Sequence, residues 1–302
     1  MARNIQIVEV GPRDGLQNES VILSTDDKLA LIDHLTDAGI TRIEAVSFAH
    51  PKYVPQLADA EAVMDRLEKR PGVSYIGLVM NWRGWVRAAN TDIDEVNVPL
   101  FASDTFNRKN QGAPTSETIA VLDEITRDAH KLGIKVTGTI GTAWGGPFEG
   151  EVGLEPLLEA VAGVVRTGVD ELAIADTIGV GDPWSVTARI AAVTESAGGI
   201  PLRVHFHDTR NTGLANAYAA IEAGVTTIDA SVGGIGGCPF APAATGNIPT
   251  DDLVYMLNRG GFDHGVSLTS LIGVSREVEE LLDKPLPAML PAAGDFPPPE
   301  LE

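Results

Sequence analysis

The 302-residue sequence contains one cysteine, Cys238, and lacks any long uninterrupted apolar segment. A single cysteine excludes a disulfide framework within the chain. The apolar runs fall far short of the ~20 residues that a membrane-spanning helix needs. The first residues, Met-Ala-Arg-Asn, lead directly into a strand-like segment, which leaves no room for a signal peptide. We therefore expect a cytoplasmic protein with no membrane partner.

Positive charge is also scarce. The sequence has 22 lysines and arginines against 42 aspartates and glutamates, and its formal net charge is −20. Lys and Arg supply the attraction to nucleic acid and to anionic membranes, so this balance argues against both partners. An anionic small molecule would need a local group of cations or a helix N-terminus. Candidates for such a group are Lys52, Arg83, Arg108 and Lys109.

Short apolar, β-branched runs recur along the chain, with amphipathic helical patterns between them. There are eight of these runs, at residues 5–10, 42–48, 74–79, 95–100, 135–140, 171–176, 202–207 and 227–232. Glycines such as Gly39 and Gly133 precede several of the runs and are typical of helix C-caps. Eight strand-then-helix units predict an α/β fold, the (β/α)8 TIM barrel. The doubly wound sheet is the rival fold, but it usually has a glycine fingerprint after strand one.

The chain continues beyond the eighth unit. Residues 267–284 have a helical pattern, which predicts an additional C-terminal helix packed on the barrel or on a partner chain. We see no linker that would divide the chain. We therefore expect a single catalytic domain over residues 1–285 that includes this helix, followed by a proline-rich tail over residues 286–302. The extra helix gives a weak indication of a homodimer.

Polar residues gather where several predicted strands end, which is where TIM barrels place their active sites. Strand one runs into Arg13-Asp14, strand seven ends in His205-Phe206-His207, and Asn247 follows strand eight. Alternate strand residues face the same side, so the two imidazoles can reach one metal ion. Asp14 and Asn247 could complete its ligands, and mixed nitrogen and oxygen ligands suit Mg²⁺ or Mn²⁺. The alternative is a structural role for the histidines.

Three further residues suggest proton and enolate chemistry. Arg13 could hold a developing enolate oxygen. Glu44, on the adjacent predicted strand, could orient Arg13 by a bidentate contact, and the alternative is an ion pair that only stabilises the barrel. Cys238 lies in the glycine- and proline-rich segment GGIGGCPFAP, where a thiol could donate or accept a proton. An inert buried thiol is the alternative for Cys238.

Several longer motifs indicate a family. They are VEVGPRDGLQNE (8–19), IEAVSFAHPKYVPQ (43–56), ADTIGVG (175–181), VHFHDT (204–209), GGIGGCPFAPAATGN (233–247) and TDDLVYML (250–257). In this order they resemble the 3-hydroxy-3-methylglutaryl-CoA (HMG-CoA) lyases over nearly the whole chain, up to about residue 285. The combination of GPRDGLQNE with H-x-H-D-T and GGCP is specific to that family, whereas a lone R-D-G indicates only the wider superfamily of barrel lyases and synthases.

The resemblance implies a carbon–carbon lyase that cleaves HMG-CoA to acetyl-CoA and acetoacetate by a metal-assisted retro-Claisen reaction, in leucine degradation. The metal ligands that it implies are Asp14, His205, His207 and Asn247. Arg13 would stabilise the enolate, and Cys238 would take part in proton transfer. Either Asp14 or His207 would receive the hydroxyl proton. Glu44 and Asp176 match supporting acids of the site. The positions expected near the acyl-CoA are Gln17, Ser47, Lys52, Asn110, Thr139, Ala173 and Thr177.

Two of these positions depart from the family pattern. Thr139 stands where a tyrosine is usual, and Ala173 stands where a serine is usual. Both would line the pocket for the end of the substrate remote from CoA, so the loss of two hydroxyl groups should weaken recognition of a terminal carboxylate. Citramalyl-CoA or a longer branched hydroxyglutaryl-CoA therefore remains open as substrate. A condensing enzyme or aldolase of the wider superfamily is the other alternative.

Overall fold

The computed structural model describes residues 3–237 and 246–297. In this part of the chain, parallel strands close into one barrel in the order β1-β10-β9-β8-β5-β4-β3-β2. The strands are β1 (Gln6–Glu9), β2 (Arg42–Ser47), β3 (Ser74–Leu78), β4 (Glu95–Phe101), β5 (Lys135–Gly141), β8 (Glu171–Asp176), β9 (Leu202–Phe206) and β10 (Thr227–Ala230). Each predicted strand run overlaps one of them, with ends that differ by no more than two residues, and the predicted (β/α)8 barrel is confirmed.

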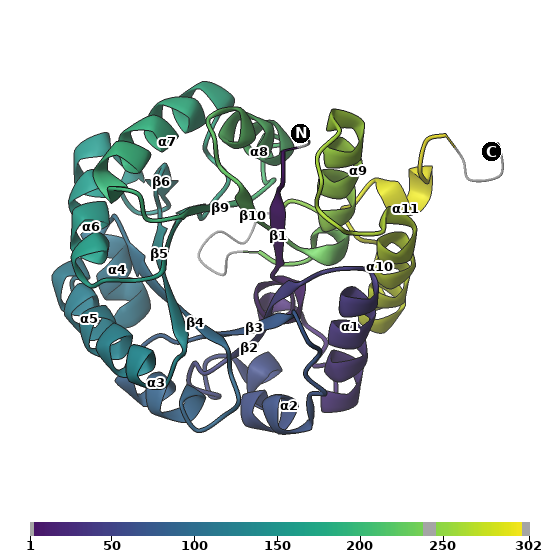
Figure 1. The fold of residues 1–302 in the computed structure, drawn as a ribbon, viewed down its shortest axis with the longest axis horizontal. Helices are drawn as coiled ribbons and strands as arrows, with labels where there is room; N and C mark the ends of the chain where they lie inside the picture. Colours follow the sequence, from purple (N-terminus) through teal and green to yellow (C-terminus); the bar gives the residue numbers. More distant parts are fainter. Residues whose placement is uncertain (1–2, 238–245, 298–302) are drawn as a thin grey trace.

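Helices surround the barrel, and the last one described, α11 (Leu290–Ala293), lies outside the ring beside its neighbours (Figure 1). They are α1 (Thr25–Asp37), α2 (Ala60–Arg66), α3 (Trp82–Ala88), α4 (Asp104–Gln111), α5 (Thr115–Lys131), α6 (Leu154–Arg166), α7 (Pro183–Ala197), α8 (Gly213–Glu222), α9 (Thr250–Gly260), α10 (Leu268–Leu282) and α11 (Leu290–Ala293). A short hairpin of β6 (Gly145–Gly146) and β7 (Gly150–Glu151) precedes α6. Local sequence sets the helix starts: Ser24 and Asp27, for example, form a capping box at the start of α1.

Side chains of the strands alternate between the surrounding helices and the inside of the barrel. On β2, Ile43 is fully buried in the apolar core, whereas Arg42 donates hydrogen bonds of 2.8 and 2.7 Å to Glu171 on β8. Since β8 lies on the opposite side of the closed barrel from β2, the Arg42 side chain must cross the interior. The floor of the barrel is therefore ionic, and the larger apolar cluster lies between strands and helices. A small separate cluster consists of Val8, Val10 and Ile76.

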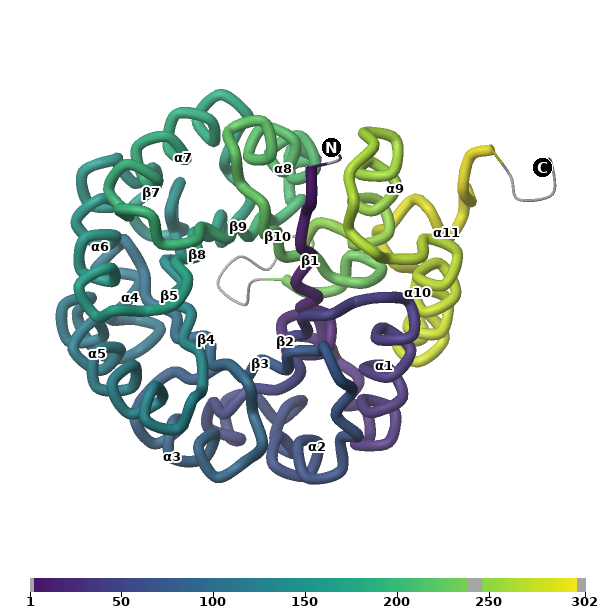
Figure 2. The backbone as a smooth tube through the Cα atoms, viewed as in Figure 1, coloured from purple at the N-terminus to yellow at the C-terminus, as the bar shows by residue number. Residues whose placement is uncertain are grey.

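The predicted C-terminal helix is α10, and it packs on its own chain. It contacts α1 and α9, and Ser275 Oγ donates a 2.6 Å hydrogen bond to Asp251 on α9. Figure 2 shows the yellow-green end of the chain beside the purple start, so these helices cover the barrel where β10 meets β1. Beyond residue 285, α11 is held by Asp252, which accepts a hydrogen bond of 3.0 Å from the backbone N–H of Leu290.

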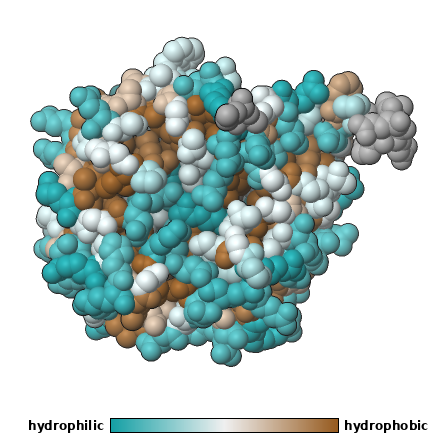
Figure 3. Space-filling view, viewed as in Figure 1, coloured by the Kyte–Doolittle hydropathy of each residue, from teal (hydrophilic) through white to brown (hydrophobic). Residues whose placement is uncertain are grey.

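The surface visible in Figure 3 is largely hydrophilic. Figure 3 shows hydrophilic side chains over much of one face, with smaller apolar areas between them. No helix in the described part of the chain combines the length and the apolar character that crossing a membrane requires.

Candidate metal and acyl-CoA site

A cavity of about 770 Å³ opens where the barrel strands end. Arg13 and Asp14 follow β1, His50 follows β2, Asn81 follows β3, and Thr177 follows β8; all of them line the cavity. His205 and His207, at the end of β9, line it as well. The C-terminal ends of strands that are far apart in sequence therefore supply one common surface.

The chain reaches this cavity from β1 through one tight helical turn, Gly11–Gly15. The carbonyl of Val10 accepts hydrogen bonds from the backbone N–H groups of Arg13, Asp14 and Gly15, at 2.7 to 3.2 Å. The turn packs so closely that a Cβ atom on Gly15 would lie 2.5 Å from Cγ1 of Ile235. A larger residue would require the Ile235 side chain to shift, so glycine after Arg13-Asp14 allows this close packing.

Arg13 is buried and shared between two carboxylates. Its Nη1 donates to Asp14 Oδ1 at 2.5 Å and its Nη2 donates to Glu44 Oε2 at 2.8 Å. Burial disfavours the guanidinium charge, but Glu44 and Asp14 outweigh burial and raise the pKa of Arg13. The expected bidentate contact with Glu44 is not formed, because the second nitrogen is taken by Asp14 and the other Glu44 oxygen accepts from Asn97 at 3.2 Å.

Asp14, His205 and His207 form a possible metal site. One potential ligand atom from each of the three lies within 4.8 Å of the others. The two imidazole rings have centroids 5.1 Å apart, as expected for alternate residues of one strand. Burial favours the neutral acid of Asp14, but Arg13 and the histidines outweigh it and lower the pKa of Asp14 to about 2. Asp14 is therefore an anionic oxygen donor at neutral pH.

Asn247 joins this group from the segment after β10. Its Nδ2 donates to Asp14 Oδ2 at 3.0 Å and to the carbonyl of Ile235 at 3.1 Å. The backbone next to Asn247 lies close to that of Gly234, because a Cβ atom on Gly246 would be 1.9 Å from the Gly234 carbonyl oxygen. Glycine at position 246 therefore allows Asn247 to reach the site.

The donor atoms present fit a divalent cation. Within the described residues, Nδ1 of His207 and Oδ1 of Asn247 are buried and have no hydrogen-bond partner. Burial and the nearby charge of His205 lower the pKa of His207 to about 4, so its ring is neutral at pH 7 and keeps a lone pair. Unpaired buried acceptors are costly unless something binds them, and a hard cation with nitrogen and oxygen ligands would.

Comparison with known proteins identifies the family. Residues 4–278 match the HMGL-like family. The chain belongs to this family. The hydroxymethylglutaryl-CoA lyase of Bacillus subtilis is 40% identical over 286 residues, which cover 95% of this chain and 96% of that protein. The mitochondrial hydroxymethylglutaryl-CoA lyase of Bos taurus is 40% identical over 282 residues, covering 93% and 87%. The resemblance to HMG-CoA lyases that the motifs predict is confirmed.

Solved structures agree with this assignment to the HMGL-like family. An HMG-CoA lyase from Acinetobacter baumannii, in complex with coenzyme A and 3-methylmalate, superposes with a TM-score of 0.94 at 37% identity. The match covers 97% of this chain and 96% of that one. The fold of this HMGL-like chain is therefore shared with that lyase over 97% of its length.

Four more of the predicted positions line the cavity of this HMGL-like chain. Gln17, Asn110, Thr139 and Thr177 are all among its lining residues. The Thr139 hydroxyl is already bound to a neighbouring residue, because it donates a 2.6 Å hydrogen bond to Asn97 Oδ1. Thr177 Oγ1 likewise accepts from the backbone N–H of Thr142 at 2.7 Å.

Other predicted positions are not among the described residues that line the cavity, or fall outside the described part of the chain. Lys52 is exposed and is not among the described residues that line it. Ser47 is buried and accepts from the Ala49 N–H at 3.2 Å. Asp176 is fully buried and accepts from the N–H groups of Val180 and Gly181, which shapes the turn after β8. Ala173 is fully buried in the wall as the register partner of Thr139, and Cys238 falls outside the described residues.

Two lining residues were missed or undervalued by sequence reasoning. Asp229 on β10 lines the cavity, with Oδ2 3.2 Å from Nδ1 of His205. Its signal was a carboxylate inside the apolar run 227–232. Lys109 on α4 is one of the four candidate cations named from the sequence. In the described part of the chain it alone among those four lines the cavity. Its Nζ lies 4.6 Å from the centroid of the Phe148 ring.

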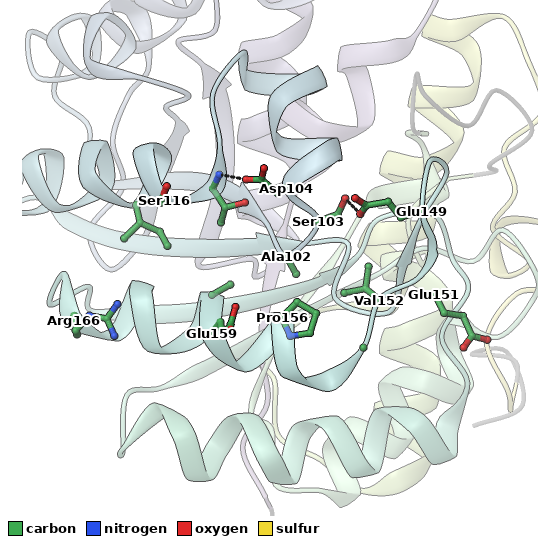
Figure 4. Close-up of a pocket in the computed structure, with 14 residues that line it drawn as sticks. Ala102, Ser103, Asp104, Ser116, Glu149, Glu151, Val152, Pro156, Glu159 and Arg166 are labelled. Carbon is green, nitrogen blue, oxygen red and sulfur yellow. Dashed lines mark hydrogen bonds between the residues drawn. The ribbon is translucent and has the colours of Figure 1, made fainter.

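A second cavity, of about 670 Å³, lies between α5, α6 and the β6–β7 hairpin (Figure 4). Its charged lining residues are mostly acidic, namely Asp104, Glu149, Glu151 and Glu159, with Arg166 as the cation. Such a lining repels the phosphates of an acyl-CoA. The cavity at the barrel mouth, with Arg13, Lys109 and the histidines, is the better match to an anionic substrate.

Proposed function

We propose that this chain is a carbon–carbon lyase that cleaves HMG-CoA to acetyl-CoA and acetoacetate. The observation that carries the proposal is the gathering of Asp14, His205, His207 and Asn247 beside Arg13 at the mouth of the barrel. The relatives that are 40% identical over most of the chain are lyases for this substrate. Their identity supports the same reaction here.

We assign the metal to Asp14, His205, His207 and Asn247, and we propose Mg²⁺ or Mn²⁺ as the ion. The ligand set mixes imidazole nitrogen, carboxylate oxygen and amide oxygen, which suits either ion. When bound, such an ion lowers the pKa of the substrate's 3-hydroxyl group and polarises an acyl oxygen.

The residues around it supply the remaining chemistry. The 3-hydroxyl proton passes to Asp14 or to His207, and the bond between C2 and C3 breaks as the carbonyl of acetoacetate forms. The bonding electrons pass to the thioester as an enolate, whose oxygen the buried Arg13 guanidinium stabilises. A proton then returns to C2, a role that we propose for Cys238. Glu44 holds Arg13 in place through its 2.8 Å contact.

An acyl-CoA would approach through the open side of the cavity. Lys109 lines that cavity on α4, with no carboxylate ion pair within the described residues, so its ammonium is available to a phosphate. The lyase from Acinetobacter baumannii has been solved with coenzyme A, which supports an acyl-CoA ligand for this chain.

Two residues in the wall of the cavity favour other acyl-CoA thioesters as second candidate substrates. Thr139 donates its hydroxyl to Asn97, and Ala173 has no hydroxyl and is buried. Neither residue offers a free donor to a terminal carboxylate in the family's usual place. Citramalyl-CoA, which yields acetyl-CoA and pyruvate, and longer branched hydroxyglutaryl-CoA thioesters are therefore the second candidates.

A substrate panel tests the proposal. Purified protein with Mg²⁺ or Mn²⁺ is given HMG-CoA, citramalyl-CoA or a branched hydroxyglutaryl-CoA, and acetyl-CoA release is measured. We expect turnover of HMG-CoA that EDTA abolishes and that either ion restores. Turnover of citramalyl-CoA alone would mean that citramalyl-CoA, and not HMG-CoA, is the substrate, while the type of reaction stays as proposed. Metal binding without cleavage of any of the three would contradict the lyase proposal, and condensation of acetyl-CoA with a 2-oxo acid would favour the synthase alternative.

Cellular and assembly properties belong to the same proposal. We propose a cytoplasmic enzyme of leucine degradation that forms a homodimer. Light scattering coupled to size-exclusion chromatography would test the dimer, with a mass near 31.8 kDa as the result that contradicts it. The apolar face of α10 packs against α1 and α9, so that face is not available to a dimer partner.

A further inference from the structure

Asp229 lies beside His205 at a position that the barrel itself fixes. The two residues are register partners on the neighbouring strands β10 and β9. Asp229 is buried, and its Oδ2 lies 3.2 Å from Nδ1 of His205. The contact therefore depends on strand pairing, which is more rigid than a loop.

The other oxygen of Asp229 faces a buried cation. Its Oδ1 lies 3.3 Å from Nε of Arg203, which is fully buried on β9. The same Nε lies 3.5 Å from Glu171 Oε2. Arg203 thus balances the charge of Asp229 from below, and the carboxylate can face the imidazole as an anion without becoming an unpaired buried charge.

We propose that Asp229 is a positioning residue for the metal site: it accepts the Nδ1–H of His205, and so directs Nε2 of that ring to the metal. This inference rests on the metal ligands assigned in the proposed function. A neutral imidazole can carry its proton on either nitrogen, and a carboxylate at Nδ1 selects one tautomer and one ring orientation. His207 has no such partner on Nδ1 within the described residues, so the two histidines are held differently.

A purely structural role for Asp229 is the competing explanation. The carboxylate belongs to the ionic floor of the barrel, together with Arg42, Glu95, Glu171 and Arg203. Glu95 offers a matched control, since it is equally buried in that floor and binds Arg42 and Thr137 but has no contact with a proposed ligand among the described residues.

The test is Mn²⁺ binding to purified wild-type protein, Asp229→Asn and Glu95→Gln, measured by titration calorimetry and by the electron spin resonance of free Mn²⁺. We expect about 10- to 100-fold weaker binding for Asp229→Asn, the usual effect of losing a carboxylate behind a metal-bound histidine. Glu95→Gln should bind as the wild type does. Equal affinity of Asp229→Asn and wild type, or an equal loss in both variants, would overturn the proposal.

A second measurement needs no variant of Asp229, should that variant fail to fold. The chain has only six histidines, so nitrogen-15 spectra of histidine-labelled, Mg²⁺-loaded protein are simple, and His205→Ala identifies the His205 signals. We expect the proton of His205 on Nδ1. A proton on Nε2 would contradict the proposal.

These readouts separate the inference from the proposed function. Weakened Mn²⁺ binding in Asp229→Asn, without any acyl-CoA cleavage by the wild type, would contradict the lyase proposal and support the positioning role of Asp229. Cleavage by the wild type, with unchanged Mn²⁺ binding in Asp229→Asn, would support the lyase proposal and contradict the positioning role. No Mn²⁺ binding by the wild type would overturn the positioning role.

Discussion

At the residue scale, two exposed lysines near the barrel mouth differ in what surrounds them. Lys109 lines the main cavity and lies over the Phe148 ring, whereas Lys52 lies outside the lining. In a chain with a net charge of −20, a cation that lines the cavity provides local attraction for an anionic substrate. The position of the ammonium group, and not its exposure, distinguishes the two.

We predict that Lys109→Ala raises the KM for the acyl-CoA substrate about 10- to 100-fold and changes kcat little, because a charge-assisted hydrogen bond contributes about 1.5–3 kcal/mol. Steady-state kinetics at fixed ionic strength measure this effect. Lys52→Ala is the control and should match the wild type. Equal KM values for the two variants would show that Lys109 does not contact the substrate.

A second prediction at the residue scale concerns the imidazole of His205. His205→Ala should lose both acyl-CoA cleavage and Mn²⁺ binding, because it removes one of the assigned ligands and leaves Asp229 without its partner. Titration calorimetry and the acetyl-CoA assay measure the two losses. His34→Ala, which removes an exposed imidazole beside Glu277, is the control. Retained metal affinity in His205→Ala would mean that the ligands are misassigned.

At the element scale, β1 is tied to the end of β10 and to α9 by one fully buried carboxylate, Glu9. Its oxygens accept hydrogen bonds from the N–H groups of Gly11 (2.7 Å) and Val232 (2.9 Å) and from the Thr250 hydroxyl (2.6 Å). Burial outweighs these hydrogen bonds and raises the pKa of Glu9 to about 7. The Glu9 carboxyl thus joins three elements that frame the site, and the protonation of this carboxyl changes with pH.

The sign of the resulting pH dependence follows from proton binding. Between the unfolded pKa of about 4.5 and the folded pKa of about 7, the folded chain holds a proton that the unfolded chain has released. The free energy of unfolding should therefore fall as pH rises through this window, by up to about 3 kcal/mol from this group. Glu9→Gln should flatten that slope in urea unfolding measured from pH 5 to 8. An unchanged slope would show that Glu9 is ionised throughout.

At the scale of the whole molecule, the barrel is closed from inside by ion pairs that span it. Arg42 on β2 binds Glu95 on β4 and Glu171 on β8, so one guanidinium connects strands from opposite sides of the barrel. Thr137 Oγ1 on β5 lies within hydrogen-bond distance of both of these carboxylates, at 2.8 and 3.1 Å, and its single O–H is shared between them. The cohesion of the barrel floor depends on this shared charge.

Arg42→Met should lower the free energy of unfolding by about 3–5 kcal/mol, because it leaves the buried Glu95 without its cation and removes one of the two cations beside Glu171. Thermal and urea unfolding measure the loss. Arg66→Met removes an exposed ion pair with Asp26 and should change stability by less than about 1 kcal/mol. Similar values for the two variants would argue against the ionic floor as a source of stability.

Much of the architecture was predictable from the sequence by itself. Buried parallel strands appear as short apolar runs, so the strand count, the barrel and the additional helix α10 follow from local patterns. The placement of His205 and His207 on one side of β9 also follows, since alternate strand residues share a face. Arg13 and Asp14 reach the cavity because the glycines around them permit a tight turn directly after β1.

Other features depend on which elements become neighbours. Only the register of β9 and β10 brings Asp229 to His205, and only barrel closure brings Arg42 to Glu171. The choice between Lys52 and Lys109 likewise required the packing of α4 at the cavity. Local composition and periodicity determine the elements and the residue types at their ends, because these act over a few residues. The pairing of distant charges was decided by the tertiary structure, because it depends on distances that arise only when the barrel closes.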